Sequence, residues 1–193
     1  MYTTKSTKKS NNVSSCDCSS CDRSSKLEST KQEEMSKTSY PKNSGAYLQT
    51  SGIKPEMQKH ITAEKLNGGA ITLGVPEQVD AQKCVGISED GKTVTILHSG
   101  VYFLIAAPQT GFTCSSGVAR FWLKKNGENV ANSNIQLNGD TNTKDVIVLQ
   151  AILECDKCDK IQVCGNGHYA QVEAIQHEGE PLVPSVIFSI FKI

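Results

Sequence analysis

Short apolar runs separated by turn residues fill the chain from residue 70 onward. Asn-Gly pairs begin at Asn126, Asn138 and Asn166, and both residue types tolerate the positive φ angles of tight hairpins. About eight such runs, with no convincing long helix between them, predict an all-β antiparallel sandwich or jelly roll over residues 70–193. The runs are residues 70–75, 93–97, 101–107, 118–125, 145–153, 161–164, 169–175 and 183–193.

The first third of the chain lacks this pattern. Residues 1–45 contain 12 Ser and 5 Thr and few large apolar residues. Such a segment cannot bury enough apolar surface to offset the entropy lost on ordering, so we expect a disordered Ser/Thr/Cys-rich tail. Residues 46–69 are expected to be a linker or a short helix, with Pro55 near the helix start and Gly68 beyond its end.

Two predicted strands carry apolar residues on both faces. Residues 101–107 are apolar without interruption, and the run 183–193 places Phe188 on one side and Phe191 on the other. An antiparallel sheet normally leaves one face to solvent, so we favour burial of the second face by a neighbouring subunit. Loops or residues 46–68 covering that face are the alternative.

The charge balance and the length of the apolar runs argue against two classes of partner, nucleic acids and membranes. The chain has 20 basic and 20 acidic residues and no net charge, divided between +3 in residues 1–45 and −3 in the rest. Nucleic-acid binding usually needs a basic excess, so we expect no nucleic-acid partner. Apolar runs fall short of the roughly 20 residues needed to span a bilayer, and no classical signal peptide is evident.

Motifs of common enzyme classes are missing from the sequence. It has neither the glycine-rich phosphate-binding patterns nor a G-x-S-x-G elbow nor an H-E-x-x-H zinc helix. We therefore expect no enzymatic activity and no catalytic residues.

Several segments, in order, resemble the jelly roll shared by tumour-necrosis-factor-like (TNF-like) proteins and complement-q globular heads. Residues 99–104 look like the family's Gly-x-Tyr strand, 121–127 like its Asn-Gly hairpin, and 185–193 like its closing strand. Residues 151–163 are similar to its Leu-x-x-Gly-Asp-x-Ile-x-Val segment. The resemblance implies a ten-stranded jelly roll that forms a homotrimer, with trimer and core packing by Tyr102, Phe103, Ile105, Phe188, Ile190 and Phe191.

Within that family the chain looks most like Bacillus spore-surface proteins, namely exosporium glycoproteins and endospore appendage subunits. This implies a structural subunit of a spore surface layer or appendage, assembled from the mother-cell cytoplasm, whose tail attaches to a coat or exosporium protein. Two features depart from the pattern. The sequence has no Gly-X-Y collagen repeat, and Cys158 stands where the family has the glycine before Asp159.

Eight cysteines supply the remaining candidate chemistry. For Cys16, Cys18 and Cys21 of the tail we favour oxidation into disulfides between subunits, with soft-metal binding as an alternative. The ligand-like spacing of Cys155, Cys158, Cys164 and His168 leaves open a zinc site, a disulfide or free thiols. No other cofactor is expected. Cys84 and Cys114 either pair with each other or are inert.

Two further functional classes stay open at this point. In the first alternative, the jelly roll of residues 70–193 is a trimeric ligand-recognition module on a flexible tether, and loops 113–117 and 136–143 are its contact surface. A Cys-based metal-binding protein is the other alternative.

Overall fold

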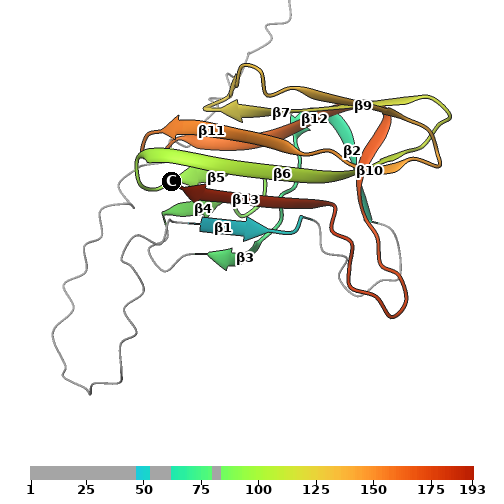
Figure 1. The fold of residues 1–193 in the computed structure, drawn as a ribbon, viewed down its shortest axis with the longest axis horizontal. Coiled ribbons are helices and arrows are strands. Elements are labelled where there is room, and N and C mark those ends of the chain that lie inside the picture. The colour runs from blue at the N-terminus through green and yellow to red at the C-terminus, as the bar shows by residue number, and fades with distance from the viewer. Residues whose placement is uncertain (1–46, 53–61, 80–83) are drawn as a thin grey trace, which may run out of the picture. The chain divides into compact units, whose positions relative to one another are not determined.

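The computed structural model describes residues 47–52, 62–79 and 84–193, which all fall in one compact unit of the chain (Figure 1). Every regular element within these ranges is a strand, and they contain no helix long and apolar enough to cross a membrane. The strands are β1 (Tyr47–Thr50), β2 (Thr62–Ala70), β3 (Pro76–Val79), β4 (Val85–Ile87), β5 (Val94–Ile96), β6 (Gly100–Phe112), β7 (Gly117–Lys125), β8 (Glu128–Asn129), β9 (Ile135–Gly139), β10 (Lys144–Val146), β11 (Leu149–Cys155), β12 (Lys160–Ala174) and β13 (Val186–Lys192).

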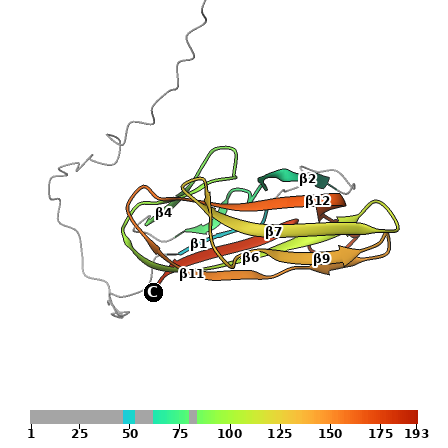
Figure 2. The same cartoon turned by 90° about the horizontal axis from the view of Figure 1, so that it is seen from above.

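The strands pair antiparallel in two layers. Sheet A has the order β3-β1-β13-β6-β11. Sheet B is built around β12, which pairs with β7 on one side and with β2 and β5 on the other, while β9 and β4 extend it. Figure 2 separates the layers, with β6, β11 and β13 in one and β7, β12 and β2 in the other. This is the sandwich architecture expected from the sequence.

Strand β6 belongs to both layers. Its residues 100–108 pair with β11 and β13 in sheet A, and residues 109–112 pair with β10 and β12. The sequence predicted a strand at 101–107, and the structure extends it to Phe112. All five residues from Pro108 to Phe112 are buried, because this half of the strand lies where the two layers meet.

The hydrophobic core lies between the layers and takes every second side chain from most strands. Tyr102 of β6, Phe121 of β7 and Phe188 of β13 are its largest fully buried side chains. The Tyr102 hydroxyl donates a hydrogen bond of 2.5 Å to the His98 carbonyl. Its polar atom is thus satisfied on burial, as buried tyrosines generally require.

The interpretation of residues 46–69 as a linker or short helix is wrong where the structure describes them. Residues 47–50 form β1 and residues 62–70 form β2, so the Gly68 proposed to end a helix lies inside a strand. Strand β2 pairs with β12 and buries Leu66 in the core. This tertiary pairing outweighs the weak local helix signal. Pro55 and the tail 1–45 lie outside the described residues.

The number and limits of the strands also differ from expectation. The run 70–75 follows β2 without being a strand itself, and 145–153 divides into β10 and β11. The runs 161–164 and 169–175 merge into β12, although Asn166-Gly167 looks like a turn. A Cβ at Gly165 would lie 2.7 Å from Leu66 and 3.1 Å from Phe121. Close packing under β2 and β7, rather than a turn, therefore explains a glycine in this segment.

Candidate functional site

The outer face of sheet A carries a band of apolar side chains. Strand register places Ile152 of β11 beside Phe103 of β6, and Phe103 beside Phe191 of β13. The two phenylalanine rings have centroids 5.1 Å apart and planes inclined at 56°, a tilted geometry that aromatic pairs favour. Three adjacent strands thus contribute one continuous apolar row.

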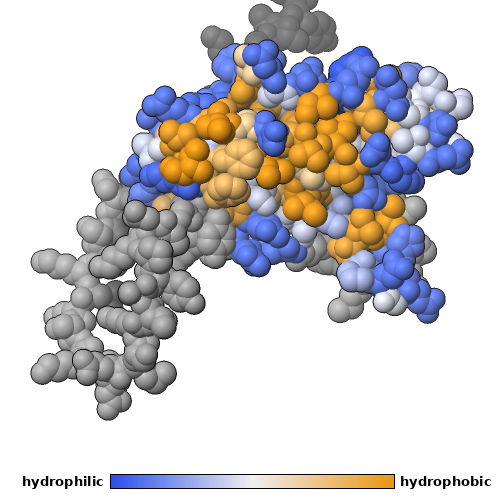
Figure 3. Space-filling view, viewed as in Figure 1, coloured by the Kyte–Doolittle hydropathy of each residue, from blue (hydrophilic) through white to orange (hydrophobic). Residues whose placement is uncertain are grey.

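This face is partly open to solvent in the single chain. Ile152 is 64% exposed and Ile187 is 47% exposed. In the next row Ile105 lies between the polar residues Gln150 and Ser189. Apart from these polar groups, the face is largely apolar, and Figure 3 shows a broad apolar surface over the region of β6, β11 and β13 with polar residues around it. Monomeric soluble proteins rarely leave contiguous apolar surface of this kind, which usually marks an interaction site.

The six residues expected to pack the core and the trimer divide between two faces. Tyr102, Phe188 and Ile190 are fully buried inside the sandwich. Phe103, Ile105 and Phe191 lie on the outer face and are half-buried. The alternation along β6 and β13 produces this division, because successive strand residues point to opposite faces.

At one end of the domain, the carboxylate of Asp159 connects two turns. One of its oxygens accepts a hydrogen bond of 2.7 Å from the Asn126 side-chain amide, and the other accepts one of 2.9 Å from the Asp156 backbone N–H. The Lys125 ammonium lies 3.0 Å from the same carboxylate. The β7–β8 hairpin and the β11–β12 turn are thereby held together.

These contacts determine the protonation of the pair. Burial favours the neutral form of Asp159, but the hydrogen bonds from Asn126 and Asp156 and the charge of Lys125 outweigh it. They hold the pKa of the Asp159 carboxyl below its ordinary value. The hydrogen bond to Asp159 in turn raises the pKa of the Lys125 ammonium. Both groups are therefore charged at neutral pH, and we interpret this cluster as structural.

Cys158, which replaces the glycine expected from the family resemblance, has a backbone φ of 75°. Its N–H donates a hydrogen bond of 2.7 Å to the Ile96 carbonyl. A positive φ is favourable for glycine and unfavourable for a residue with a Cβ. The turn therefore keeps the backbone shape that suits a glycine and accommodates a thiol at that position.

The structure does not bring Cys155, Cys158, Cys164 and His168 together. Cys155 ends β11, Cys158 lies in the following turn, and the other two lie along β12. Cys155 and Cys164 are buried free thiols, so neither forms a disulfide within the single chain. In the described ranges no group of three or more His, Cys, Asp or Glu residues is placed to hold a metal ion. The strand pairing of β12 spreads these side chains apart.

The five described cysteines differ in their chemistry. Cys114 is a half-buried free thiol in the β6–β7 loop, so the possible Cys84–Cys114 disulfide is not formed. Hydrogen bonds from Ser116 and Ser115 lower the pKa of the Cys114 thiol. Burial instead raises the pKa of both Cys155 and Cys164. We therefore expect Cys114 to be the most reactive of these three thiols.

Cys16, Cys18 and Cys21 lie outside the described residues, so the structure does not bear on the cross-linking hypothesis. Sequence analysis, in turn, did not single out Ile152, the most exposed residue of the apolar row. The alternation within Leu149–Cys155 places Ile152 on the face opposite the core, but a single apolar run over residues 145–153 does not show this alternation.

Comparison with known proteins identifies the fold. No protein-family model matches the chain, and no curated protein matches it. Among solved structures, it is similar to Eiger TNF from S. frugiperda, with a TM-score of 0.50 and 10% identity over 77% of this chain and 92% of that one. Murine APRIL at pH 5.0 is also similar, with a TM-score of 0.49 and 10% identity over 77% and 99%. The described part of this chain therefore has a TNF-like jelly-roll fold.

Proposed function

We propose that this chain is a structural subunit that assembles as a homotrimer through the outer face of sheet A. The observation that carries the proposal is the apolar row Ile152–Phe103–Phe191, which crosses three strands and is partly exposed in the single chain. Covering this row with a second copy removes apolar surface from water, at roughly 25 cal/mol per Å². The TNF-like fold is consistent with a trimer, which the sequence resemblance implies.

A cyclic trimer suits this surface for a geometric reason. Each copy presents the same face to a common axis, so closed symmetry buries all three faces and leaves no unpaired contact surface that could add further copies. The polar Gln150 and Ser189 beside Ile105 then lie within or at the border of the contact, where they restrict how the copies are aligned.

Residues 1–45 supply the second half of the proposal. Their three closely spaced cysteines, Cys16, Cys18 and Cys21, cross-link trimers or attach them to a partner layer by disulfides. With the sequence resemblance to Bacillus spore-surface proteins, this supports a role in a bacterial spore surface layer or appendage. The tail's partner is then a coat or exosporium protein.

Light scattering of the full chain under reducing conditions tests the trimer. We expect a mass of about three times 20.9 kDa. Ile152→Asp places a charge in the contact and should give a monomer with an unchanged circular dichroism spectrum, because Ile152 is 64% exposed. Tyr169→Asp is the matched control, since Tyr169 is 50% exposed on β12 of the other sheet. A monomeric wild type, or an unaffected Ile152→Asp trimer, contradicts the proposal.

Non-reducing gel electrophoresis of native material tests the cross-linking. High-mass species should disappear when Cys16, Cys18 and Cys21 are all changed to Ser, while the trimer measured in reductant is kept. Cys114→Ser is the control for adventitious oxidation of an accessible thiol. Antibody labelling of intact spores tests the location, and label confined to the spore interior would argue against a surface role.

A further inference from the structure

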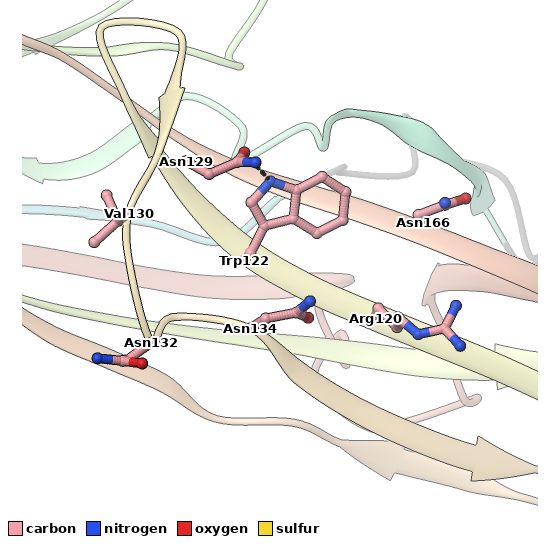
Figure 4. A pocket seen from close by; sticks show the side chains of 7 residues that line it. All are labelled: Arg120, Trp122, Asn129, Val130, Asn132, Asn134 and Asn166. Atoms are coloured by element: carbon pink, nitrogen blue, oxygen red, sulfur yellow. Dashed lines mark hydrogen bonds between the residues drawn. The ribbon is translucent and has the colours of Figure 1, made fainter.

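A polar groove lies on the outer face of sheet B, away from the proposed contact face. It has a cavity volume of about 310 Å³, within the usual range of small-ligand sites. Strands β7 and β12 form its floor with Arg120, Trp122 and Asn166, and the segment after β8 forms its wall with Asn132 and Asn134 (Figure 4). Asn129 and Val130 complete the lining.

Trp122 is the centre of this groove. It projects from the outward side of β7, half-buried, and its indole N–H donates a hydrogen bond of 2.9 Å to the Asn129 side-chain oxygen. The polar atom of the indole is thus engaged within the protein and its ring is fixed in orientation. Figure 4 shows the ring surrounded by Asn129, Asn134 and Asn166. A fixed aromatic ring among polar groups is suited to stacking against a flat ligand face at low entropic cost.

The groove also offers many hydrogen-bonding groups. Within the described part of the chain, the side chains of Asn132, Asn134 and Asn166 have no hydrogen-bond partner. Each amide presents two donor hydrogens and one acceptor oxygen. Hydroxyl groups are likewise both donors and acceptors, so a ligand rich in hydroxyls matches this set better than one with a single polarity.

Arg120 is the single charged residue lining the groove. Its Nε donates a hydrogen bond of 2.8 Å to the Gln136 side-chain oxygen, which fixes the guanidinium. Its remaining N–H groups make no hydrogen bond to the described residues, and they are arranged to receive a carboxylate. Binding of a nucleic-acid strand requires several positive charges along the path of its phosphates, and this groove offers only one.

We propose that this groove binds a sugar ring of an oligosaccharide, stacked on Trp122 and hydrogen-bonded by the surrounding asparagines. A sugar ring has the required combination of an apolar face of C–H groups and a rim of hydroxyls. An acidic sugar would also pair its carboxylate with Arg120, whereas a neutral one would use the amides alone. The inference does not depend on the trimer, because β7 and β12 pair in sheet B, whereas the proposed contact face belongs to sheet A.

The full chain contains one tryptophan, so its intrinsic fluorescence reports directly on the groove. Wild-type protein is first applied to a glycan array of neutral and acidic oligosaccharides. The best neutral and best acidic sugars are then titrated while the Trp122 emission is followed. Binding should shift the emission to shorter wavelength and protect it from iodide quenching. Hexathymidylate serves as the probe for the competing nucleobase-stacking mode.

Variants assign the binding to the lining residues. Asn166→Ala and Asn134→Ala should each weaken binding roughly tenfold, and Arg120→Gln should weaken only the acidic sugar. Trp122→Ala, measured by calorimetry, should abolish binding; Trp122→Phe should retain part of it and shows that the site still folds. Lys124→Ala is the matched control, because Lys124 lies two residues along β7 outside the groove.

Three outcomes overturn the proposal. They are the absence of binding to any array sugar, sugar binding that leaves Trp122 fluorescence and the variants unaffected, and a response to hexathymidylate but not to sugars.

The trimer proposal is tested separately from the groove. Ile152→Asp should keep the affinity of the groove for a free oligosaccharide while changing the assembly mass. Its binding to the immobilised array should fall, because multivalency is lost with the trimer.

Discussion

The side-chain amide of Asn126 donates a hydrogen bond of 2.7 Å to the carboxylate of Asp159, across 33 positions of sequence. The Asn126 side-chain oxygen accepts a second bond of 2.8 Å from the Lys160 N–H. Asn126 itself has a φ of 53°, as a tight hairpin requires. One asparagine therefore shapes its own turn and joins it to the β11–β12 turn.

Asp159→Asn should lower the free energy of unfolding by about 2 kcal/mol at pH 7. The substitution removes the charge that Lys125, Asn126 and the Asp156 N–H jointly stabilise. Because the pKa of Asp159 is lowered in the folded state, its contribution is present above pH about 4 and is lost as the pH falls through the folded-state pKa. Urea unfolding at pH 7 and at pH 3 measures both effects.

The difference between wild type and Asp159→Asn should therefore shrink in acid. Asp156→Asn is the control, because Asp156 is exposed in the same turn and its substitution should change stability by less than about 0.5 kcal/mol. Equal losses for both variants would show that the buried network contributes nothing specific.

Cys158→Gly should raise the free energy of unfolding by about 0.5–1 kcal/mol. The φ of 75° at this position strains a residue with a Cβ, and glycine removes that strain while adding some freedom to the unfolded chain. Thermal and urea unfolding under reductant provide the measurement. Cys158→Ser keeps the Cβ and should match the wild type. A gain in both variants would implicate the thiol instead of the backbone.

Alkylation should distinguish the thiols of the folded domain. At pH 7 iodoacetamide should modify Cys114 faster than Cys155 or Cys164, because its pKa is lowered while burial raises theirs. Peptide mass spectrometry of timed samples gives each rate. In urea the three rates should converge. Fast modification of Cys155 in the native protein would mean that the end of β11 opens readily.

Lys144→Met should destabilise the domain by about 2 kcal/mol. The Lys144 ammonium lies 2.5 Å from the Glu173 carboxylate, whose side chain is only 2% exposed. Its loss leaves Gln171 as the remaining side-chain donor to that carboxylate within the described chain. Adding Glu173→Gln should recover most of the loss, since the buried charge is then gone. Urea unfolding of the two single variants and the double variant completes the cycle, and simple additivity would contradict the coupling.

The sequence predicted the all-β sandwich correctly because its signals are local. Alternation along residues 117–125 and 186–192 and the Asn126-Gly127 turn depend only on neighbouring residues. Strand β2 was missed because Thr62–Ala70 is polar and contains Asn67-Gly68-Gly69. Its strand conformation results from pairing with β12, about 100 residues later in the chain, which no local pattern shows.

The candidate sites likewise depended on long-range strand pairing that local sequence patterns do not show. The spacing of Cys155, Cys158 and Cys164 suggested a shared site, but Cys155 ends β11, Cys158 lies in the following turn and Cys164 lies within β12. The groove around Trp122 depends on Asn166, which strand register places beside Arg120. Arg120 belongs to no motif, and the Asn166-Gly167 pair is typical of a turn, so sequence alone gave no reason to connect the two residues.

By itself, then, the sequence determined which faces of β6 and β13 are apolar, because a strand alternates its side chains whatever it packs against. It also determined the turn chemistry at Asn126. The tertiary structure decided which of those faces is the core and which is open, and it set Ile152, Phe103 and Phe191 in one row. Pairing between strands distant in sequence fixes register, and register alone determines which side chains become neighbours.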